Sequence, residues 1–246
     1  MVPFGGEGVK GAEPALSCGL SPPPRARYGG KDGPREGRMI SVEDEGAAGA
    51  RARVIRLDRP DKANALTREM LQAVADAAAG AWDAGAKVLI LTGAGKVFSA
   101  GADLEAAKVG LATDPVWDLA SNAVAAFPGL SVAALNGTLA GGAFGIALAC
   151  DCRVAVDSAN FFYPVMRLGY RPQPADPARL AALVGPARAK MILMGGARIT
   201  APEALAWGLV DRLVPPGGAL EAARTLAADA LAADPAHVAA IRAMLP

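Results

Sequence analysis

The segment from Asn136 to Asp151, NGTLAGGAFGIALACD, limits the possible folds of this chain more than any other stretch. It follows an apolar run, Ser131 to Leu135, that has the length and bounding turn residues of a buried strand. Asn136-Gly137 and Gly141-Gly142 are turn signals, and residues 143–149 predict a short buried helix. The first N–H groups of a helix lack intrahelical acceptors, and the helix dipole adds partial positive charge there. This downstream corner (residues 136–151) is therefore suited to hold an anion or a carbonyl oxygen that is becoming one.

Two other interpretations of the downstream corner stay open when its residues are taken alone. No residue from Gly129 to Cys150 is charged, and the run is long enough for a transmembrane helix. The glycine pairs would interrupt such a helix near its middle, which argues against it. A plain core unit, in which the glycines serve only close packing, fits the same residues, because Gly-x-x-x-Gly-Gly alone is a weak signal.

A second glycine corner lies upstream and changes this balance. Residues 96–104, KVFSAGADL, follow an apolar strand expected at Lys87 to Leu91 and a turn at Thr92 to Gly95. In this upstream corner (residues 96–104), the backbone N–H just after Gly101 could point into a pocket. Two such corners on neighbouring strand–helix units could aim two N–H donors at one oxygen. The two corners together indicate an oxyanion-binding site, which neither corner indicates alone.

Composition and charge fit a globular protein. The chain has 246 residues, of which 52% are hydrophobic and 20% charged, enough for one large domain or two small ones. A formal net charge of +1 offers no field to gather nucleic acid or an anionic membrane. Cys18, Cys150 and Cys152 form no disulfide or metal framework, which favours a cytoplasmic setting with the last two as core thiols. The only histidine, His237, is expected on a solvated helix surface, which leaves few histidine-based sites.

The alternation of strands and helices predicts α/β layers. Residues 1–38 are rich in Gly and Pro, show no structural period, and are expected to be a disordered extension or the product of an upstream start codon. The folded domain is expected at residues 39–246, with structure from about Arg53. Strands are expected at 54–57, 87–91, 131–135, 153–156, 160–163 and 209–214. Helices are expected at 68–84 after a Thr67 cap, 115–126, 143–149, 176–184 with Asp176 as cap, 187–194, 202–208, 219–233 and 235–244.

Four motifs in this order resemble the crotonase superfamily, the enoyl-CoA hydratase/isomerase proteins. Residues 59–66, RPDKANAL, are similar to the family's opening CoA-binding loop, and residues 98–104, FSAGADL, to its first oxyanion segment. The downstream corner is similar to its second oxyanion segment, and residues 196–211 to its helix–strand signature. The resemblance implies a crotonase-like spiral of ββα turns with helical C-terminal elements, here with a shorter C-terminal region than usual. It also implies a homotrimer or a dimer of trimers.

The same resemblance implies an acyl-CoA thioester lying between the two corners. By position, the oxyanion donors are the backbone N–H groups of Ala102 and Gly142, which would polarise the thioester carbonyl and stabilise an enolate. Asp103 is expected to brace its loop. No metal or cofactor is implied beyond the CoA of the substrate. The positions expected along the CoA are Lys62, Ala63, Ala100, Asp103 and Leu104.

The chain departs from the family where hydratases carry two catalytic glutamates. The matching positions are Gly145 and Val165, which cannot exchange protons. Gln173, which is not a base, stands where some members place a catalytic aspartate. Because general acid–base catalysis is worth roughly 10²–10⁴-fold, ordinary enoyl-CoA hydration is expected to be crippled.

A reaction that needs the oxyanion hole but no glutamate is therefore favoured. Decarboxylation of a malonyl-type thioester is one, because loss of carbon dioxide leaves the enolate directly. Tyr170 is the favoured catalytic residue for it, with Tyr163 in the same segment, and Arg167 or Arg171 could hold a carboxylate. The simpler interpretation is a core position for Tyr163 and solvated loop positions for both arginines.

Two alternatives remain open. The chain could be a non-catalytic acyl-CoA-binding protein that keeps the thioester clamp without turnover. It could also have weak hydratase or isomerase activity that uses a base at another position, with Asp176 and Glu105 as candidates. The sequence leans towards an enzyme, a lyase or isomerase acting on CoA thioesters.

Overall fold

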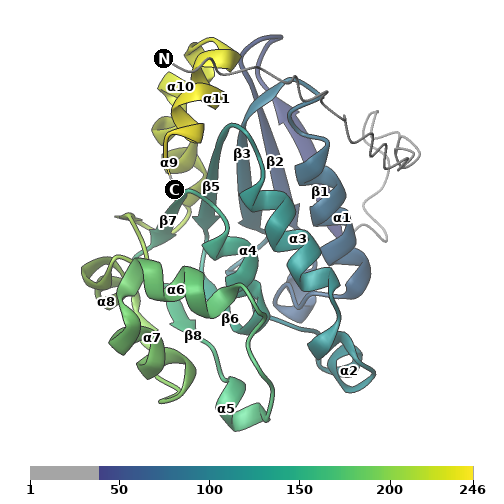
Figure 1. Ribbon diagram of the computed structural model, residues 1–246, viewed down its shortest axis with the longest axis vertical. Helices are drawn as coiled ribbons and strands as arrows, with labels where there is room; N and C mark the ends of the chain where they lie inside the picture. Colours follow the sequence, from purple (N-terminus) through teal and green to yellow (C-terminus); the bar gives the residue numbers. More distant parts are fainter. Residues whose placement is uncertain (1–38, 246) are drawn as a thin grey trace, which may run out of the picture. The chain divides into compact units, whose positions relative to one another are not determined.

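The computed structural model describes residues 39–245, which form one compact unit of two sheets and surrounding helices (Figure 1). The expectation for residues 1–38 lies outside the described residues. Within residues 39–245, no helix has the length and apolar character needed to cross a membrane.

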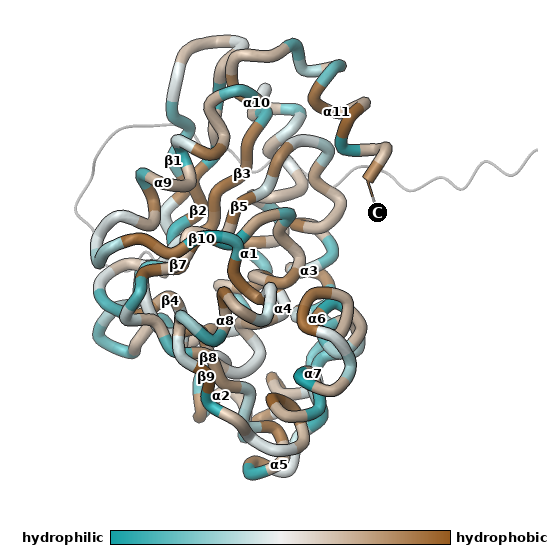
Figure 2. The backbone as a smooth tube through the Cα atoms, turned by 90° about the vertical axis from the view of Figure 1, so that its left-hand side faces the viewer, coloured by the Kyte–Doolittle hydropathy of each residue, from teal (hydrophilic) through white to brown (hydrophobic). Residues whose placement is uncertain are grey.

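The larger sheet has six strands and forms the centre of the fold. Its first two strands pair antiparallel, and every other neighbouring pair is parallel. All eight residues of the third strand are buried, as expected where helices cover both faces of a parallel sheet. Figure 2 shows β3 and β5 as hydrophobic segments inside the molecule. In spatial order the strands are β1 (Ile40–Glu45), β2 (Arg51–Leu57), β3 (Ala86–Gly93), β5 (Leu130–Leu135), β7 (Cys152–Val156) and β10 (Arg212–Val214).

A smaller sheet of four strands runs alongside it. The chain steps from the large sheet to the small one three times, from β3 to β4, from β5 to β6 and from β7 to β8, and a helix follows each step. This repeat is the ββα spiral that the sequence motifs imply, and the fold class is confirmed. The strands in spatial order are β4 (Val97–Ser99), β6 (Thr138–Ala140), β8 (Asn160–Phe162) and β9 (Ile199–Thr200).

Helices cover the large sheet. Helices α1 (Arg68–Ala79) and α3 (Val116–Ala125) pack on each other, while α9 (Ala219–Leu226) and α10 (Ala228–Ala232) pack against β3 and its neighbours (Figure 1). The predicted Thr67 cap is confirmed, because its side chain accepts from the Met70 N–H. The other helices are α2 (Leu104–Lys108), α4 (Phe144–Leu148), α5 (Val165–Leu168), α6 (Asp176–Val184), α7 (Pro186–Leu193), α8 (Ala201–Trp207) and α11 (Pro235–Ala243), with 3-10 turns η1 (Pro60–Lys62), η2 (Leu111–Thr113) and η3 (Gly141–Ala143).

Several predicted boundaries were wrong. Strand β1 was not predicted, since ISVEDE carries three acidic residues and lies at the charged edge of the sheet. Helix α1 ends at Ala79 because Gly80 is its C-cap, and the strand predicted at residues 209–214 begins only at Arg212. The helix predicted at residues 219–233 is divided in two at Ala227. Asp176 is the first residue of α6 rather than its cap, and its carboxyl is turned away towards Tyr163.

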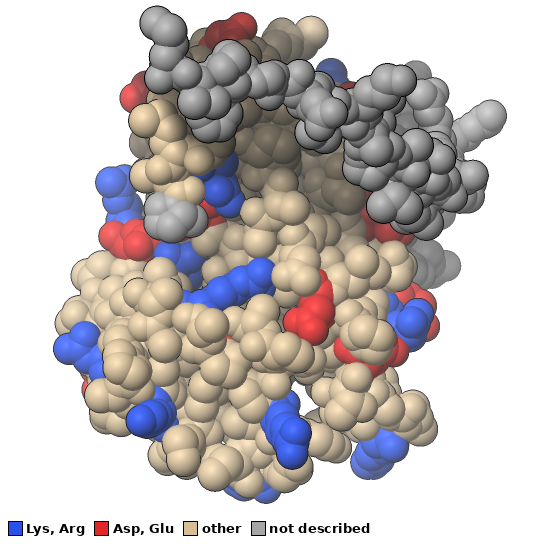
Figure 3. Space-filling model, viewed as in Figure 1, with Lys and Arg blue, Asp and Glu red and all other residues tan. Residues whose placement is uncertain are grey.

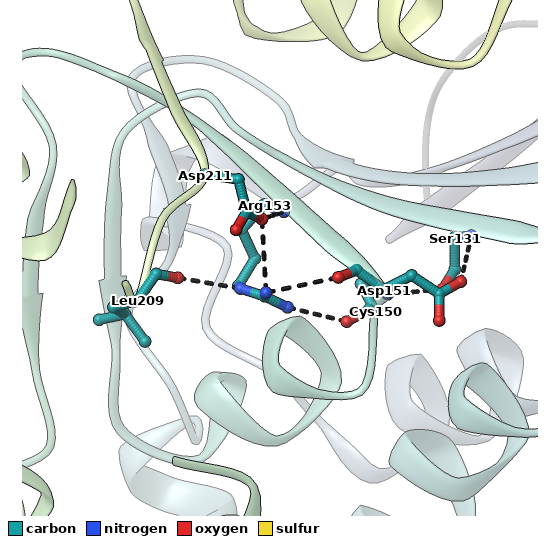
Figure 4. A network of polar contacts seen from close by, with 6 residues as sticks. All are labelled: Ser131, Cys150, Asp151, Arg153, Leu209 and Asp211. Atoms are coloured by element: carbon teal, nitrogen blue, oxygen red, sulfur yellow. Dashed lines mark hydrogen bonds and ion pairs between the residues drawn. The ribbon is translucent and has the colours of Figure 1, made fainter. Parts of the chain in front are cut away.

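A buried arginine joins the end of the large sheet to the chain before β10 (Figure 4). The side chain of Arg153, on β7, is only 3% exposed. Its guanidinium donates to the carbonyl oxygens of Leu209 at 2.9 Å and Cys150 at 2.8 Å. The Arg153 backbone N–H donates to Asp211 Oδ2 at 2.7 Å. These bonds fix the neighbouring turn, where Asp151 Oδ2 accepts from the N–H and the hydroxyl of Ser131, both at 2.8 Å.

We predict that Arg153→Met lowers the free energy of unfolding by about 1–3 kcal/mol, because it leaves the carbonyl oxygens of Leu209 and Cys150 without their hydrogen-bond donor. Urea unfolding measures this change. The matched control Arg212→Met, at an exposed position of β10, should change stability by no more than about 0.5 kcal/mol. Equal effects of the two substitutions would contradict the role of Arg153.

Candidate active site

The two glycine corners are in direct contact. Strands β4 and β6, which lead into them, pair in parallel. A Cβ on Gly101 would lie 2.9 Å from the Ala140 carbonyl oxygen and 3.1 Å from the Gly141 Cα. Gly101 and Gly141 also have φ values of 93° and 57°, in the left-handed region that favours glycine. The structure therefore brings together the two segments that the sequence predicted to meet.

In the upstream corner, the Ala102 N–H is left available for a ligand. Leu66 bridges this segment in parallel: its N–H donates to the Gly101 oxygen at 2.7 Å, and its oxygen accepts from the Asp103 N–H at 2.9 Å. The intervening N–H, that of Ala102, has no backbone acceptor within residues 39–245.

In the downstream corner, Gly142 has the matching property. It is the second residue of η3, where a backbone N–H has no intrahelical acceptor. A Cβ on Gly142 would come within 2.9 Å of the Trp117 ring, so this position has no room for a side chain. Trp117 is itself fixed, because its indole N–H donates to the Leu111 oxygen at 2.7 Å. The positions predicted as oxyanion donors thus both present N–H groups at the ends of touching corners.

A loop of residues 59–66 is hydrogen-bonded onto the upstream corner. Asn64 is fully buried, and its side chain donates to the oxygens of Ala94 at 2.9 Å and Val97 at 2.7 Å. The Ala63 oxygen accepts from the Ala100 N–H at 3.0 Å, and the Asn64 oxygen accepts from the Ser99 hydroxyl at 2.8 Å. This predicted CoA-binding loop and the upstream corner therefore form one hydrogen-bonded edge of the candidate site.

Asp103 braces that edge. Its Oδ1 accepts from the N–H groups of Glu105 and Ala106 and so caps α2, while its Oδ2 pairs with Arg59 at 2.7 Å. The hydrogen bond from Arg59, followed by that from the Ala106 N–H, lowers the pKa of this carboxyl. Around the braced loop, the remaining predicted CoA positions lie at or near the surface: Lys62, Ala100 and Leu104 are exposed, and Ala63 is partly buried.

A buried carboxyl fills the space beside Gly145, where the expected glutamate is missing. A Cβ on Gly145 would lie 2.8 Å from Asp176 Oδ1. Asp176 is 1% exposed, and its Oδ2 accepts from the Tyr163 hydroxyl at 2.8 Å. The other oxygen, Oδ1, has no hydrogen-bond partner among the described residues.

The surroundings of Asp176 shift the pKa of its carboxyl towards neutral pH. Burial raises the pKa of this carboxyl from its ordinary 3.8 to about 7. The hydrogen bond from Tyr163 and the charge of Arg179 act in the opposite direction, and the charge of Asp118 adds to the rise. Burial and the charge of Asp176 together raise the pKa of the Tyr163 hydroxyl, which therefore stays protonated and acts as the donor.

Three of the remaining candidates are exposed. The side chain of Tyr170, predicted to be catalytic, is 40% exposed, while Tyr163 is buried, as its simpler interpretation required. Arg167, on α5, and Arg171, in the loop that follows it, are both exposed, so the predicted loop position was wrong for Arg167. Gln173 donates from its side-chain amide to the Ala112 oxygen at 3.1 Å.

His237 and Cys150 lie where the sequence predicted, whereas Cys152 is only partly buried. His237 is exposed on α11, and Cys150 is a core thiol whose pKa burial raises to about 12. Among residues 39–245, no group of three or more His, Cys, Asp or Glu side chains is arranged to hold a metal ion.

Sequence reasoning named Asp176 only as one candidate base and did not place it. Its position before an alanine-rich helix predicted a cap, which is the commonest role for aspartate there. The glycine at position 145 indicates that another acidic residue is needed if a carboxyl is to be kept at this place. The sequence does not show which one, because the contact between α4 and α6 that brings Asp176 there appears only in the structure.

Comparison with known proteins gives one consistent result. A family model described as enoyl-CoA hydratase/isomerase matches residues 48–246. The chain is 40% identical over 199 residues to a carnitinyl-CoA dehydratase of Salmonella arizonae, covering 76% of this chain and 74% of that one. It is 38% identical, with the same coverage, to a carnitinyl-CoA dehydratase of Salmonella typhi.

Solved structures that are similar to this chain carry the same family description. A structure of an enoyl-CoA hydratase from Bacillus anthracis matches with a TM-score of 0.75 and 31% identity, covering 83% of this chain and 81% of that one. A structure of an enoyl-CoA hydratase/carnitine racemase from Magnetospirillum magneticum matches with a TM-score of 0.76 and 30% identity, covering 84% and 79%.

We predict that Asp176 makes the folded protein less stable as the pH rises. Because its pKa is raised in the folded state, the protonated form favours folding below pH 3.8, and this contribution is lost between pH 3.8 and about 7. At about 1.4 kcal/mol for each pH unit, the loss amounts to roughly 4 kcal/mol at most. Asp176→Asn removes it, so the stability of the variant relative to wild type should increase across this range. Parallel unfolding free energies of the two proteins from pH 4 to 8 would contradict this.

Proposed function

Because this chain belongs to the enoyl-CoA hydratase/isomerase family, we propose that it binds an acyl-CoA thioester and stabilises the enolate of its acyl group. The thioester oxygen is placed between the backbone N–H groups of Ala102 and Gly142. The CoA runs along residues 59–66 and the upstream corner, past Lys62, Ala63, Ala100, Asp103 and Leu104.

The contact between the two corners carries this proposal. Two N–H groups without backbone acceptors among residues 39–245, at the ends of segments held together at Gly101 and Gly141, supply the two fixed donors that a developing oxyanion needs. Removing one such donor from an enzyme costs about 2.7–4 kcal/mol of transition-state stabilisation. Because the donors are backbone groups, they need no particular side chain and no metal ion.

Proton-transfer chemistry at the α-carbon is the reaction class that the site supports best. The relatives named carnitinyl-CoA dehydratase carry out, by that name, a dehydration of a CoA ester. Elimination of water next to a thioester needs an enolate-stabilising site together with a group that moves protons. The carboxyl of Asp176 beside Gly145, whose Oδ1 has no hydrogen-bond partner among the described residues, supports the presence of such a group.

Decarboxylation of a malonyl-type thioester is a second candidate. It is favoured by Gly145 and Val165, which leave both family glutamate positions without a proton carrier. The enolate would form directly on loss of carbon dioxide, with Tyr170 as the candidate catalytic residue. The exposed position of the Tyr170 side chain gives this candidate less support than proton transfer has.

Assembly as a homotrimer or a dimer of trimers in the cytoplasm is part of the proposal. Large apolar side chains are exposed on the described surface, and such side chains favour contacts between subunits. Figure 3 shows one face on which charged side chains stand in small groups among broad uncharged areas. The apolar side chains include those of Leu104, Val109, Met166, Met194 and Met244.

We predict that the protein binds butyryl-CoA at least tenfold more tightly than S-butyl-CoA. The two ligands differ by a thioester carbonyl in place of a methylene group. The carbonyl would accept two hydrogen bonds, each worth about 0.5–1.5 kcal/mol, and about 1.4 kcal/mol in total is a tenfold difference in affinity. Isothermal titration calorimetry measures both affinities. Equal affinities, or no binding of either ligand, would contradict the proposed function.

The second candidate makes its own prediction. Malonyl-CoA and methylmalonyl-CoA should be stable in the presence of the protein if proton transfer is its chemistry. If decarboxylation is its chemistry, mass spectrometry should detect acetyl-CoA or propionyl-CoA, at a rate that falls on Tyr170→Phe. Absence of product from both thioesters would remove this candidate.

A further inference from the structure

We propose that Asp176 is the proton-transferring catalytic residue of this site, delivered from α6 into the space left by the missing side chain at Gly145. The inference rests on the proposed function, since it needs an acyl thioester held at Ala102 and Gly142. It assigns to the site the proton carrier that neither Gly145 nor Val165 can supply.

The position of the carboxyl follows from helix geometry. Gly142 and Gly145 are three residues apart in the continuous η3–α4 segment, so they lie on the same side, about one turn apart. Asp176 Oδ1 lies 2.8 Å from the place where a Gly145 Cβ would be. A carboxyl oxygen thus stands about one helical turn from the N–H that holds the thioester oxygen. The α- and β-carbons of an acyl group extend over that distance.

The two oxygens of the Asp176 carboxyl differ, because Oδ2 accepts a hydrogen bond and Oδ1 accepts none from the described residues. Tyr163 stacks on Phe144 at a centroid distance of 5.4 Å, and its hydroxyl accepts from the Gln173 N–H at 3.4 Å while donating to Asp176 Oδ2. Among the described residues, Oδ1 has no hydrogen-bond partner although it is buried, which is unfavourable unless a ligand supplies the partner. Tyr163 is therefore a positioning residue that fixes the carboxyl with Oδ1 available.

Charged side chains from two helices shift the pKa of this carboxyl and so affect the pH range in which it can transfer a proton. Arg179, on α6, favours the ionised form, while Asp118, on α3, opposes it. Asp118 Oδ1 and Arg179 Nη1 are also without hydrogen-bond partners among the described residues. With a pKa of about 7, Asp176 changes protonation within the range where a general acid or base is most effective.

The proposed step balances with one carboxyl. Ionised Asp176 takes a proton from the α-carbon, and the electron pair of that C–H bond passes into the enolate held by the Ala102 and Gly142 N–H groups. With a β-hydroxyacyl thioester, the enolate re-forms the carbonyl and the Cα–Cβ double bond as the β-hydroxyl leaves. Asp176 returns the proton to that hydroxyl, so water is released and the carboxylate is regenerated. With a saturated acyl group, the protonated carboxyl exchanges its proton with solvent and returns a solvent-derived proton to the α-carbon, so isotope exchange is the only net change.

Exchange of the α-protons of butyryl-CoA in D₂O, followed by mass spectrometry, tests the inference. We expect wild-type protein to catalyse exchange with a rate that rises as the pH passes through about 7. Asp176→Asn should reduce that rate by about 10²-fold or more while the preference for butyryl-CoA over S-butyl-CoA remains. A variant that exchanges as fast as wild type, or a wild type that binds the thioester without exchange, would overturn it. Loss of the thioester preference in the wild type would instead overturn the proposed function.

Two matched variants separate catalysis from structural support. Asp118→Asn removes a neighbouring acid, so exchange should persist with its pH midpoint moved lower. Tyr163→Phe removes a hydrogen bond that stabilises the carboxylate, so exchange should persist with its midpoint moved higher. Unmoved midpoints in both variants would contradict the assignment, because a purely structural Asp176 would not set the pH profile.

Returning the carboxyl to α4 gives an independent test. Gly145→Glu alone brings its Cβ within 2.8 Å of Asp176 Oδ1 and should destabilise the protein. In the double variant Gly145→Glu with Asp176→Gly this contact is removed, and exchange should exceed that of Asp176→Gly by at least tenfold. Equal exchange in these two folded, thioester-binding variants would contradict a role for a carboxyl at this place.

Discussion

The close approach of two backbone segments at Gly101 and Gly141 sets the geometry of the whole site. A Cβ at Gly101 would fall within 3.1 Å of backbone atoms of the other corner, so the approach requires glycine. Strands β4 and β6 bring the corners together, and the small sheet exists because the chain leaves the large sheet after β3 and β5. The two N–H groups are therefore positioned by the sheet topology and by the close approach of the two corners.

This arrangement explains how the chain can depart from its family and still keep a usable site. Loss of the side chain at Gly145 opens a space one turn beyond the Gly142 N–H, and Asp176 reaches the same space from a different helix. In our proposal the carboxyl is kept while its position in the sequence changes. A site of this kind is recognised from the geometry and chemistry of its groups rather than from their sequence positions.

Much of the fold could be predicted from local patterns. The apolar run of β3, the cap at Thr67 and the glycine corners each depend on neighbouring residues, so the sequence displays them directly. Strand β1 could not be predicted, because its acidic residues hide the alternation and its pairing with β2 supplies the missing information. The donor positions that we propose rest on motifs. The placement of Asp176 beside Gly145 depends on how α6 packs on α4, which no local pattern indicates.

A crystal structure of the protein with butyryl-CoA bound is the most direct test of the central claim. It would locate the thioester oxygen relative to the backbone nitrogens of Ala102 and Gly142. The account predicts that this oxygen lies about 2.7–3.1 Å from both nitrogens. A thioester bound elsewhere, or one whose oxygen faces away from either nitrogen, would contradict it.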